Sequence, residues 1–490
     1  MSTQANPTRV LVLGCGSVAQ CVIPLLIRDL KIATSSITIV DFVDNRHRVA
    51  DAIKQGVKYE IGQVTRENLD SFLAERLAAG DILLDLAWNI DCPTILEWCR
   101  MRGVRYLNTS VELWDPYYDM AKTHPLDRTL YVRHQSIRKM VAKWGSNKGP
   151  SAVVEHGANP GLVSHFAKQA LFEISNKILN DGRAGSRQSA IESALASESF
   201  DRLAMLTGTR VIHISERDTQ ITNQPKEVNE FVNTWSVEGF YEEGVAPAEM
   251  GWGTHERWMP ANAQVHADDG PCNQICLAQP GMETWVRSWV PSGEILGMII
   301  RHGESYTMSN HLTVRDDSGK AIYRPTVHYS YCPSNEAINS VLELRMRNWQ
   351  KQPKERIMNN EIISGRDELG VLLLGHDYTG WWTGTRLSID EARSIVDGQS
   401  ATTLQVAGSV IAAVKWMIAS PNEGVCVPDD LPWKSVLADA RPYIGEIHSA
   451  PTDWDPLKTR NDLFPGFGNT GRLDTTDPWQ FRNFLTPTPS

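Results

Sequence analysis

The stretch Val10-Leu11-Val12-Leu13-Gly14-Cys15-Gly16-Ser17-Val18-Ala19 decides the fold that we expect for the amino-terminal part of the chain. Four consecutive apolar residues predict a buried strand, and the glycines after them predict a tight turn into a helix. In such a turn the first glycine allows the bend, the second lets a pyrophosphate approach the backbone, and the third position needs a small residue, here Ala19. The stretch therefore predicts a dinucleotide site with the candidate residues Gly14, Gly16, Ser17 and Val18.

A candidate residue for binding the ribose of that dinucleotide lies at the end of the next predicted strand. Asp41 follows residues 37–40 and lies 25 positions beyond Gly16, where a carboxylate can accept hydrogen bonds from the adenosine ribose hydroxyls. Because an acidic side chain repels a 2′-phosphate, Asp41 favours NAD over NADP. Arg46 and Arg48 are close enough in sequence to leave NADP open.

The first 155 residues alternate between short β-branched runs and longer helical patterns. This alternation predicts an α/β fold with a Rossmann-type, doubly wound parallel sheet. The predicted strands are 10–13, 37–40, 57–61, 82–87, 104–107 and 152–154, and the predicted helices lie near 18–30, 45–55, 66–79, 93–102 and 134–144.

The pattern of predicted secondary structure changes after about residue 160. Alternating segments at 210–214, 231–237, 295–301, 305–314 and 326–331 are separated by Gly, Pro and Asn, which predicts a second, α+β domain with a mixed or antiparallel sheet. We expect a dinucleotide domain over 1–155, a substrate domain over 156–388, a helical return packing on the first domain over 389–450, and an extension over 451–490. Trp454, Phe464 and Trp479 favour an ordered flap over a flexible terminus in that extension.

Composition excludes several classes of protein. The 490 residues carry 48 Lys and Arg against 58 Asp and Glu, a formal net charge of −10, so neither a nucleic acid nor an anionic membrane is an expected partner. The eight cysteines form no CxxC pair, which is typical of reduced thiols, and no metal site is expected. The polar amino terminus does not resemble a signal peptide, and the apolar segment 409–419 is too short to cross a bilayer. We expect a cytoplasmic protein.

Acidic and aromatic residues are mixed in one segment, 216–249. It holds eight acidic residues against two basic ones, and therefore six of the ten excess negative charges, with Phe231, Trp235, Phe240 and Tyr241 among them. A carboxylate beside an indole face suits an alkylammonium ligand, since a cation–π contact contributes roughly 0.5–2 kcal/mol. A carboxylate or imidazole nearby could also remove the ammonium proton. A solvated acidic face is the alternative.

Other polar residues follow predicted strands, where α/β folds place ligands. His302 comes after the apolar run 295–301, and Asn159 lies in the segment Glu155-His156-Gly157-Ala158-Asn159-Pro160-Gly161. Asn89 and Asp91 follow the strand at 82–87, and Glu112 follows the strand at 104–107. Structural roles, such as a helix cap for Asn159, are the alternatives.

Several blocks of this sequence resemble those of a known protein family. The blocks HGANPGLVSHF (156–166), HISERDTQ (213–220), NTWSVEGF (233–240), GWGTHERWMP (251–260), DELGVLLLGH (367–376) and DPWQFRN (477–483) are similar to those of bacterial homospermidine synthases, which belong to the saccharopine-dehydrogenase-like group. The resemblance spans nearly the whole chain. It implies NAD-dependent, redox-neutral conversion of two putrescine molecules to homospermidine and ammonia through bound imines, with spermidine as a further donor, and it implies a homodimer.

The resemblance also implies roles for particular residues. Trp235 would supply the cation–π face, Glu216 and Glu243 would hold ammonium groups and assist proton transfer, and His302 would relay protons. Asp367 would anchor an amine. A polar wall near the nicotinamide would consist of Asn159, which would also contact the cofactor, and of Asn89, Asp91 and Glu112.

Two other functions stay open at this point. A saccharopine- or carboxyspermidine-type dehydrogenase would share the fold but would need arginines for substrate carboxylates, and Arg257 and Arg301 are the candidates. A non-catalytic NAD-binding sensor would have no reason to gather Glu216, Trp235, Glu243 and His302 around a nicotinamide.

Overall fold

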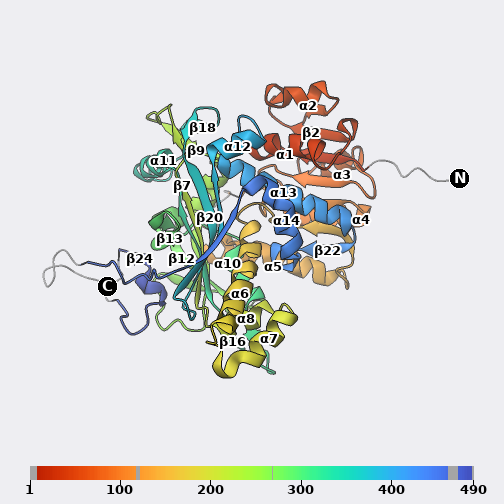
Figure 1. The fold of residues 1–490 in the computed structure, drawn as a ribbon. Helices are drawn as coiled ribbons and strands as arrows, with labels where there is room; N and C mark the ends of the chain where they lie inside the picture. The colour runs from red at the N-terminus through yellow and green to blue at the C-terminus, as the bar shows by residue number, and fades with distance from the viewer. Residues whose placement is uncertain (1–7, 117–121, 268, 462–472, 488–490) are drawn as a thin grey trace.

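The computed structural model describes residues 8–116, 122–267, 269–461 and 473–487. Two sheets organise these residues (Figure 1). The amino-terminal sheet and its helices lie on the right of the view, and a larger sheet lies on the left, with the yellow helices α6 (Leu162–Asn180), α7 (Gln188–Ala196) and α8 (Phe200–Thr207) at the bottom. The chain therefore has two sheet-based parts in contact with one another.

The amino-terminal sheet has seven strands in the order β22-β6-β5-β4-β1-β2-β3, and every pairing is parallel. This order and direction confirm the Rossmann-type, doubly wound prediction. The strands are β1 (Val10–Leu13), β2 (Ile37–Asp41), β3 (Lys58–Ile61), β4 (Ile82–Asp85), β5 (Arg105–Asn108), β6 (Gly149–Val153) and β22 (Glu423–Cys426), and the helices are α1 (Ser17–Arg28), α2 (Ala50–Lys54), α3 (Leu69–Ala74), α4 (Cys92–Arg102) and α5 (Leu130–Lys143).

The larger sheet has eleven strands along the path β11-β12-β10-β17-β7-β20-β21-β23, with β13, β14 and β24 attached. It is mixed, as expected, because β17 pairs with β7 in parallel and its other pairings are antiparallel. The strands are β7 (Val211–Asp218), β10 (Pro247–Gly251), β11 (Ala263–Val265), β12 (Gln274–Pro280), β13 (Trp285–Val290), β14 (Gly293–Met298), β17 (Thr326–Cys332), β20 (Arg366–Leu374), β21 (Gly380–Ser388), β23 (Ile447–Thr452) and β24 (Leu485–Thr486).

Three small two-stranded sheets and three further helices complete this part. The paired strands are β8 (Ile221–Thr222) with β19 (Ile362–Ser364), β9 (Glu230–Asn233) with β18 (Lys354–Ile357), and β15 (Val314–Arg315) with β16 (Ala321–Tyr323). The helices are α9 (Val237–Val245), α10 (Glu304–His311) and α11 (Asn335–Met346).

Two predicted strands in this part are wrong. Of the predicted strand 305–314, residues 305–311 belong to helix α10, in which six consecutive residues from Glu304 are buried, so the helix lacks the one-sided pattern by which it could be recognised. The strand predicted at 231–237 ends at Asn233, because Ser236 caps α9 through a hydrogen bond that its side chain accepts from the Gly239 N–H.

The returning segment divides between the two parts. Helices α13 (Ala401–Ala419) and α14 (Trp433–Ile444) pack together, and α13 also packs on α1, whereas α12 (Ile389–Ile395) lies against β21. Helix α13 begins eight residues before the expected apolar segment 409–419, so by length and composition it could cross a membrane, and the prediction that this segment is too short to do so is wrong. Because 78% of its most apolar 18-residue window is buried inside the structure, it is a core helix here.

The carboxyl-terminal extension packs on the larger sheet. Trp454, Phe481 and Phe484 are buried in one cluster with Trp382 of β21, and β24 pairs with β13. Phe464, one of the three aromatic residues on which the prediction of an ordered flap rests, lies outside the described residues. None of the described residues beyond 450 lines the pocket between the two sheets.

This cluster predicts the effect of removing one ring. Phe484→Ala empties a fully buried site and should lower the free energy of unfolding by about 3–5 kcal/mol. Met346→Ala removes a side chain that is 76% exposed and should change it by less than about 0.5 kcal/mol. Urea unfolding followed by tryptophan fluorescence measures both, and equal stabilities of the two variants would contradict the packing described.

Candidate active site

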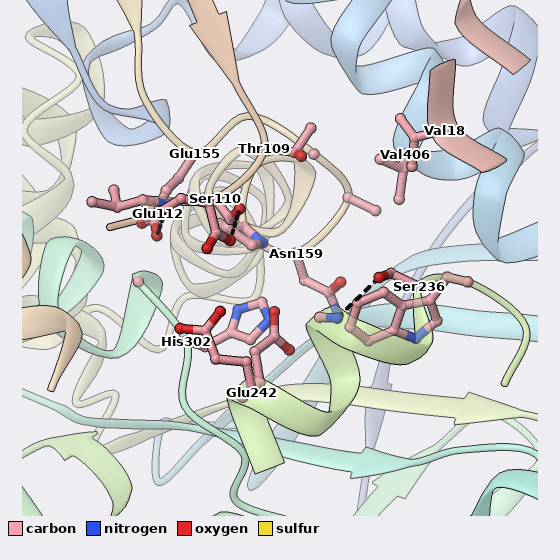
Figure 2. Close-up of a pocket in the computed structure, with 18 of the residues that line it drawn as sticks. Val18, Thr109, Ser110, Glu112, Glu155, Asn159, Ser236, Glu242, His302 and Val406 are labelled. Carbon is pink, nitrogen blue, oxygen red and sulfur yellow. Dashed lines mark hydrogen bonds between the residues drawn. The ribbon is translucent and has the colours of Figure 1, made fainter. Parts of the chain in front are cut away.

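A pocket lies between the two sheets, at the carboxyl ends of the amino-terminal strands. The segments after β4, β5 and β6 contribute residues 86–88, 109–112, 155 and 157–160 to its wall, and the opposite wall comes from β7, α9 and the loop before α10. Figure 2 shows Glu112 and Glu155 on one side of this space and Glu242 and His302 on the other. Parallel α/β sheets bind ligands at this edge.

The glycine-rich turn has the geometry that a dinucleotide requires. Gly14 has a φ of +86°, and a Cβ there would lie 2.7 Å from the Leu86 carbonyl oxygen, so a larger residue does not fit. Beside Gly16 an added Cβ would meet no atom within 4 Å, which leaves open space where a pyrophosphate would lie. The amino terminus of α1 has no side-chain cap, so its N–H groups are available to phosphate.

Asp41 lies beside this turn. Its carboxylate accepts hydrogen bonds from the backbone N–H of Cys15 at 2.6 Å and of Val43 at 2.8 Å. The predicted ribose residue and the predicted pyrophosphate turn are thus in contact. Of the predicted cofactor residues, Val18 and Asn159 line the pocket itself, and the others lie next to it at the ends of β1 and β2. The arrangement fits a dinucleotide whose nicotinamide end would reach the pocket.

Glu216 forms a buried cluster with two partners. Its Oε2 accepts hydrogen bonds from Asn159 Nδ2 and Tyr329 Oη, which come from the loop after β6 and from β17. Burial raises the pKa of Glu216 to about 7, although both hydrogen bonds favour the charged form. Glu216 can therefore exchange a proton near neutral pH.

Two other carboxylates have unsatisfied oxygens. Among the described residues, the buried Oε2 atoms of Glu243 and Glu112 have no hydrogen-bond partner. Burial raises the pKa of Glu243 to about 7, and burial together with the charge of Glu242 raises that of Glu112 to about 8. Because a buried acceptor without a donor is costly, these oxygens suit a ligand that brings N–H groups and positive charge.

His302 carries a proton at neutral pH. Burial opposes its charged form, but the Glu304 carboxylate, 2.7 Å from Nδ1, raises the pKa of His302 to about 9 with help from Glu243 and Glu155. Its ring also lies 4.5 Å from the ring of Tyr329, centroid to centroid. Since Nδ1 is engaged with Glu304, the proton on Nε2 is the one that a ligand can receive.

Trp235 contributes an aromatic face to the same pocket. Its Nε1 donates a hydrogen bond to Tyr331 Oη at 3.0 Å, which fixes the indole, and a Cβ on Gly239 would come within 3.0 Å of the ring. In the part of the chain that the structure describes, no Lys or Arg lies over this ring. The indole face is therefore available to a cationic ligand.

The structure does not bring Asn89, Asp91 and Asp367 to the pocket wall. Asn89 accepts a hydrogen bond from the Asp115 N–H at 2.6 Å, and Asp91 caps α4 by accepting from the Thr94 N–H at 2.9 Å. Both stabilise local turns. Asp367 is fully buried on β20 behind the wall residue Thr402, whose hydroxyl donates to it at 2.7 Å. Burial, with the neighbouring Glu216, raises the pKa of Asp367 well above its usual value.

Of the two arginines that could have bound a substrate carboxylate, one is paired with a protein carboxylate and the other lies outside the pocket. Arg301 lines the pocket but pairs with Glu242, which also binds Arg133 at 2.7 Å. Although burial opposes the charge on Glu242, the two guanidinium groups lower its pKa to about 2, so Glu242 is ionised and the three groups together carry one net positive charge. Arg257 lies away from the pocket, 3.7 Å from Asp474 of the carboxyl-terminal extension.

Sequence reasoning missed Tyr329, Glu242 and Glu155 as pocket residues. Glu155 has a φ of +60°, and its Oε2 lies 2.7 Å from Nε2 of His134. A Cβ on Gly303 would overlap Glu155 Oε2 at 1.8 Å, so glycine is required beside His302. The partner of Glu155 comes from α5, 21 residues earlier, and no local pattern links the two.

The charge on His302 can be tested directly. In the full-length protein, the imidazole of His302 should titrate with a pKa of about 9 by nuclear magnetic resonance. Glu304→Gln removes the contacting carboxylate and should lower that pKa, because the charged ring loses its nearest counter-ion. Glu283→Gln removes a carboxylate outside the pocket and should leave it unchanged; equal effects from the two variants would contradict the assignment.

Comparisons with known proteins agree with this architecture. Residues 10–153 match the family model "Saccharopine dehydrogenase NADP binding domain", and residues 157–452 match "Saccharopine dehydrogenase C-terminal domain". Homospermidine synthase from Blastochloris viridis is 40% identical over 481 residues, 97% of either chain, and that from Mesorhizobium japonicum is 38% identical over 97% of this chain and 96% of that one.

A solved structure is also similar over almost the whole chain. Homospermidine synthase from Legionella pneumophila, determined in complex with NAD, is 36% identical, covers 98% of both chains and superposes with a TM-score of 0.85. With two sheets, one site between them and full-length matches of this kind, the chain belongs to the homospermidine synthase family of saccharopine-dehydrogenase-like proteins.

Proposed function

We propose that this protein is an NAD-dependent homospermidine synthase, which transfers an aminobutyl group from one putrescine to another and releases ammonia. One observation carries the proposal: two buried carboxylate oxygens without partners, on Glu243 and Glu112, share a pocket with the indole of Trp235 beside a dinucleotide turn. A diamine brings the N–H groups and charge that these groups lack. The family membership supports the same substrate class.

The cofactor would be held by Gly14, Gly16 and the amino terminus of α1, with Asp41 at its ribose. NAD bound there supplies a hydride acceptor for the carbon that carries an amino group, and later returns the hydride, so that no dinucleotide is consumed. The protein must supply everything else: amine binding, proton movement and exclusion of water.

Amine binding and deprotonation fall to the carboxylates. Trp235 faces one ammonium group, while Glu243 and Glu216 accept its hydrogen bonds. Because burial raises the pKa of each carboxylate to about 7, either can take a proton from the ammonium group and leave the neutral amine that hydride loss requires. We assign the opposite role to His302: with a pKa of about 9, its Nε2 can return a proton to the departing ammonia.

Exclusion of water protects the carbon–nitrogen double bond between the two hydride transfers. Val18, Val406 and residues 86–88 form an apolar part of the wall next to the dinucleotide turn. Such a surface keeps water from hydrolysing the substrate imine before the second amine attacks. Spermidine as a second donor, a homodimer and a cytoplasmic location stay predictions from the sequence.

The stoichiometry of the reaction tests the proposal. With putrescine and a catalytic amount of NAD⁺, the protein should form homospermidine and ammonia in equal amounts, without accumulation of NADH absorbance. NADH accumulating in proportion to putrescine, with no triamine formed, would instead identify a dehydrogenase.

Removal of the aromatic face tests the amine site. Trp235→Ala should lower kcat/KM for putrescine at least roughly 30-fold, since a desolvated cation–π contact contributes about 2 kcal/mol. NAD affinity should not change, because the indole lies outside the glycine turn. Trp235→Phe should lose less. Trp144→Ala removes a tryptophan outside this pocket, and a loss of the same size there would refute the role of Trp235.

The pH dependence follows from the two kinds of titrating group. Amine binding needs Glu216 and Glu243 ionised, so kcat/KM should rise as pH increases through about 7, where these carboxyl groups lose their protons. It should fall again above about pH 9, where His302 loses its proton. Glu304→Gln should move the alkaline limb to lower pH; a profile flat from pH 6 to 10 would contradict these assignments.

A further inference from the structure

A second hollow, of about 300 Å³, lies at the other end of the strands that carry the active site. Arg210 immediately precedes β7, and Arg324 comes two residues before β17, which pairs with β7 in parallel. Glu216 and Tyr329 lie farther along these same two strands. The hollow therefore opens at the amino ends of β7 and β17, and the active-site pocket opens toward their carboxyl ends.

Three arginines and one carboxylate line this hollow. Arg210 pairs with Asp477 at 2.9 Å, and Arg257 lies 3.6 Å from the same carboxylate. Arg257 also lies 3.7 Å from Asp474, which does not line the hollow. Asp477 is 3% exposed and belongs to the carboxyl-terminal extension. Within the lining, three positive charges face a single negative one.

Arg324 is the arginine without a counter-ion. Its Nε donates a hydrogen bond to the Trp252 carbonyl oxygen at 2.7 Å, and in the described part of the chain its two terminal NH₂ groups have no acceptor and no carboxylate within 4 Å. Partial burial and the nearby guanidinium of Arg315 lower its pKa. A guanidinium that is partly desolvated next to a like charge is unfavourable unless an anion joins it.

The other titratable groups around the hollow do not supply that anion. Glu256 accepts hydrogen bonds from the Thr326 hydroxyl at 2.6 Å and from the Phe481 N–H at 2.9 Å, and burial raises its pKa to about 7. Burial lowers the pKa of His255, whose Nε2 lies 3.1 Å from the Trp479 carbonyl oxygen. The hydroxyl of Tyr323 donates to the Thr209 carbonyl oxygen.

We propose that this hollow binds a phosphate group, held by Arg324 together with Arg210 and Arg257. With Asp474 counted as a further counter-ion of Arg257, the uncompensated positive charge is that of Arg324, and guanidinium groups bind phosphate oxygens in paired, charge-assisted hydrogen bonds. The site is distinct from the amine pocket, because its charge repels polyamines. A bound phosphate joins the amino ends of β7 and β17 to the extension that carries Asp477.

Titration of the full-length protein with inorganic phosphate, against chloride at equal ionic strength, tests the site. Calorimetry should show saturable binding, and the thermal unfolding midpoint should rise with phosphate concentration, because a ligand that binds the folded state stabilises it. Glycerol 3-phosphate forms a second arm, which distinguishes a phosphate ester from the free ion. Absence of saturable binding in both arms would overturn the proposal.

Variants locate the binding. Arg324→Gln should weaken phosphate affinity roughly tenfold or more, since a hydrogen bond to a charged group contributes about 1.5–3 kcal/mol. Because Arg324→Gln also removes the hydrogen bond to the Trp252 carbonyl oxygen, the rise of the unfolding midpoint with phosphate is measured for each variant against its own midpoint in chloride, and that rise should be smaller in Arg324→Gln. Arg324→Lys keeps the positive charge but lacks the paired N–H donors of the guanidinium group, so it should lose less phosphate affinity than Arg324→Gln. Arg345→Gln removes an arginine that pairs with Glu283 elsewhere, and should leave phosphate affinity unchanged. Unchanged affinity in Arg324→Gln, or an equal loss in Arg345→Gln, would overturn the assignment.

Discussion

Burial of carboxylates at the contact between the two sheets is the constraint on which the rest of the site depends. Moving a charged carboxylate out of water is costly unless other groups compensate it. The protein compensates Glu242 fully, with Arg133 and Arg301, and leaves Glu243 and Glu112 with free oxygens. Glu242 is therefore a structural carboxylate, whereas Glu243 and Glu112 have oxygens whose hydrogen-bond donors a ligand must supply.

The same constraint sets the protonation of the pocket. Burial raises the pKa of a carboxyl group such as that of Glu243, which can then take up a proton near neutral pH. The pKa of His302 is also raised, by Glu304, Glu243 and Glu155, but a raised pKa keeps an imidazole protonated and charged. Acceptors and a donor of protons thus coexist near neutral pH within one enclosed space. Neither state could be inferred from residue types alone, because both depend on burial, and the pKa of His302 depends also on Glu243 and Glu155, which are distant in sequence, as well as on the nearby Glu304.

Local patterns predicted the amino-terminal sheet well and the rest of the molecule less well. Each strand of a parallel sheet and the helix after it are contiguous in sequence, so the segment from Val10 to Val153 shows its structure locally. The larger sheet pairs β7 with β20, more than 140 residues later, and no local signal encodes that pairing. Asn89 and Asp91 were predicted at the correct edge of the sheet, but position at an edge does not fix side-chain direction. Tyr329 and Glu155 were missed because their partners, Glu216 and His134, come from other elements.

Strand β22 has a consequence for how the chain is made. It completes the edge of the amino-terminal sheet beside β6, and helix α13 covers α1, yet both come from beyond residue 400. A nascent chain of only the first 155 residues therefore has β6 as its edge strand in place of β22, and the apolar face of α1 that α13 covers is exposed. The dinucleotide domain is therefore one unit of the folded structure, but it is not complete when its own residues have been synthesised. Fragments cut at its apparent boundary should need the rest of the polypeptide, in cis or added separately, to stay in solution.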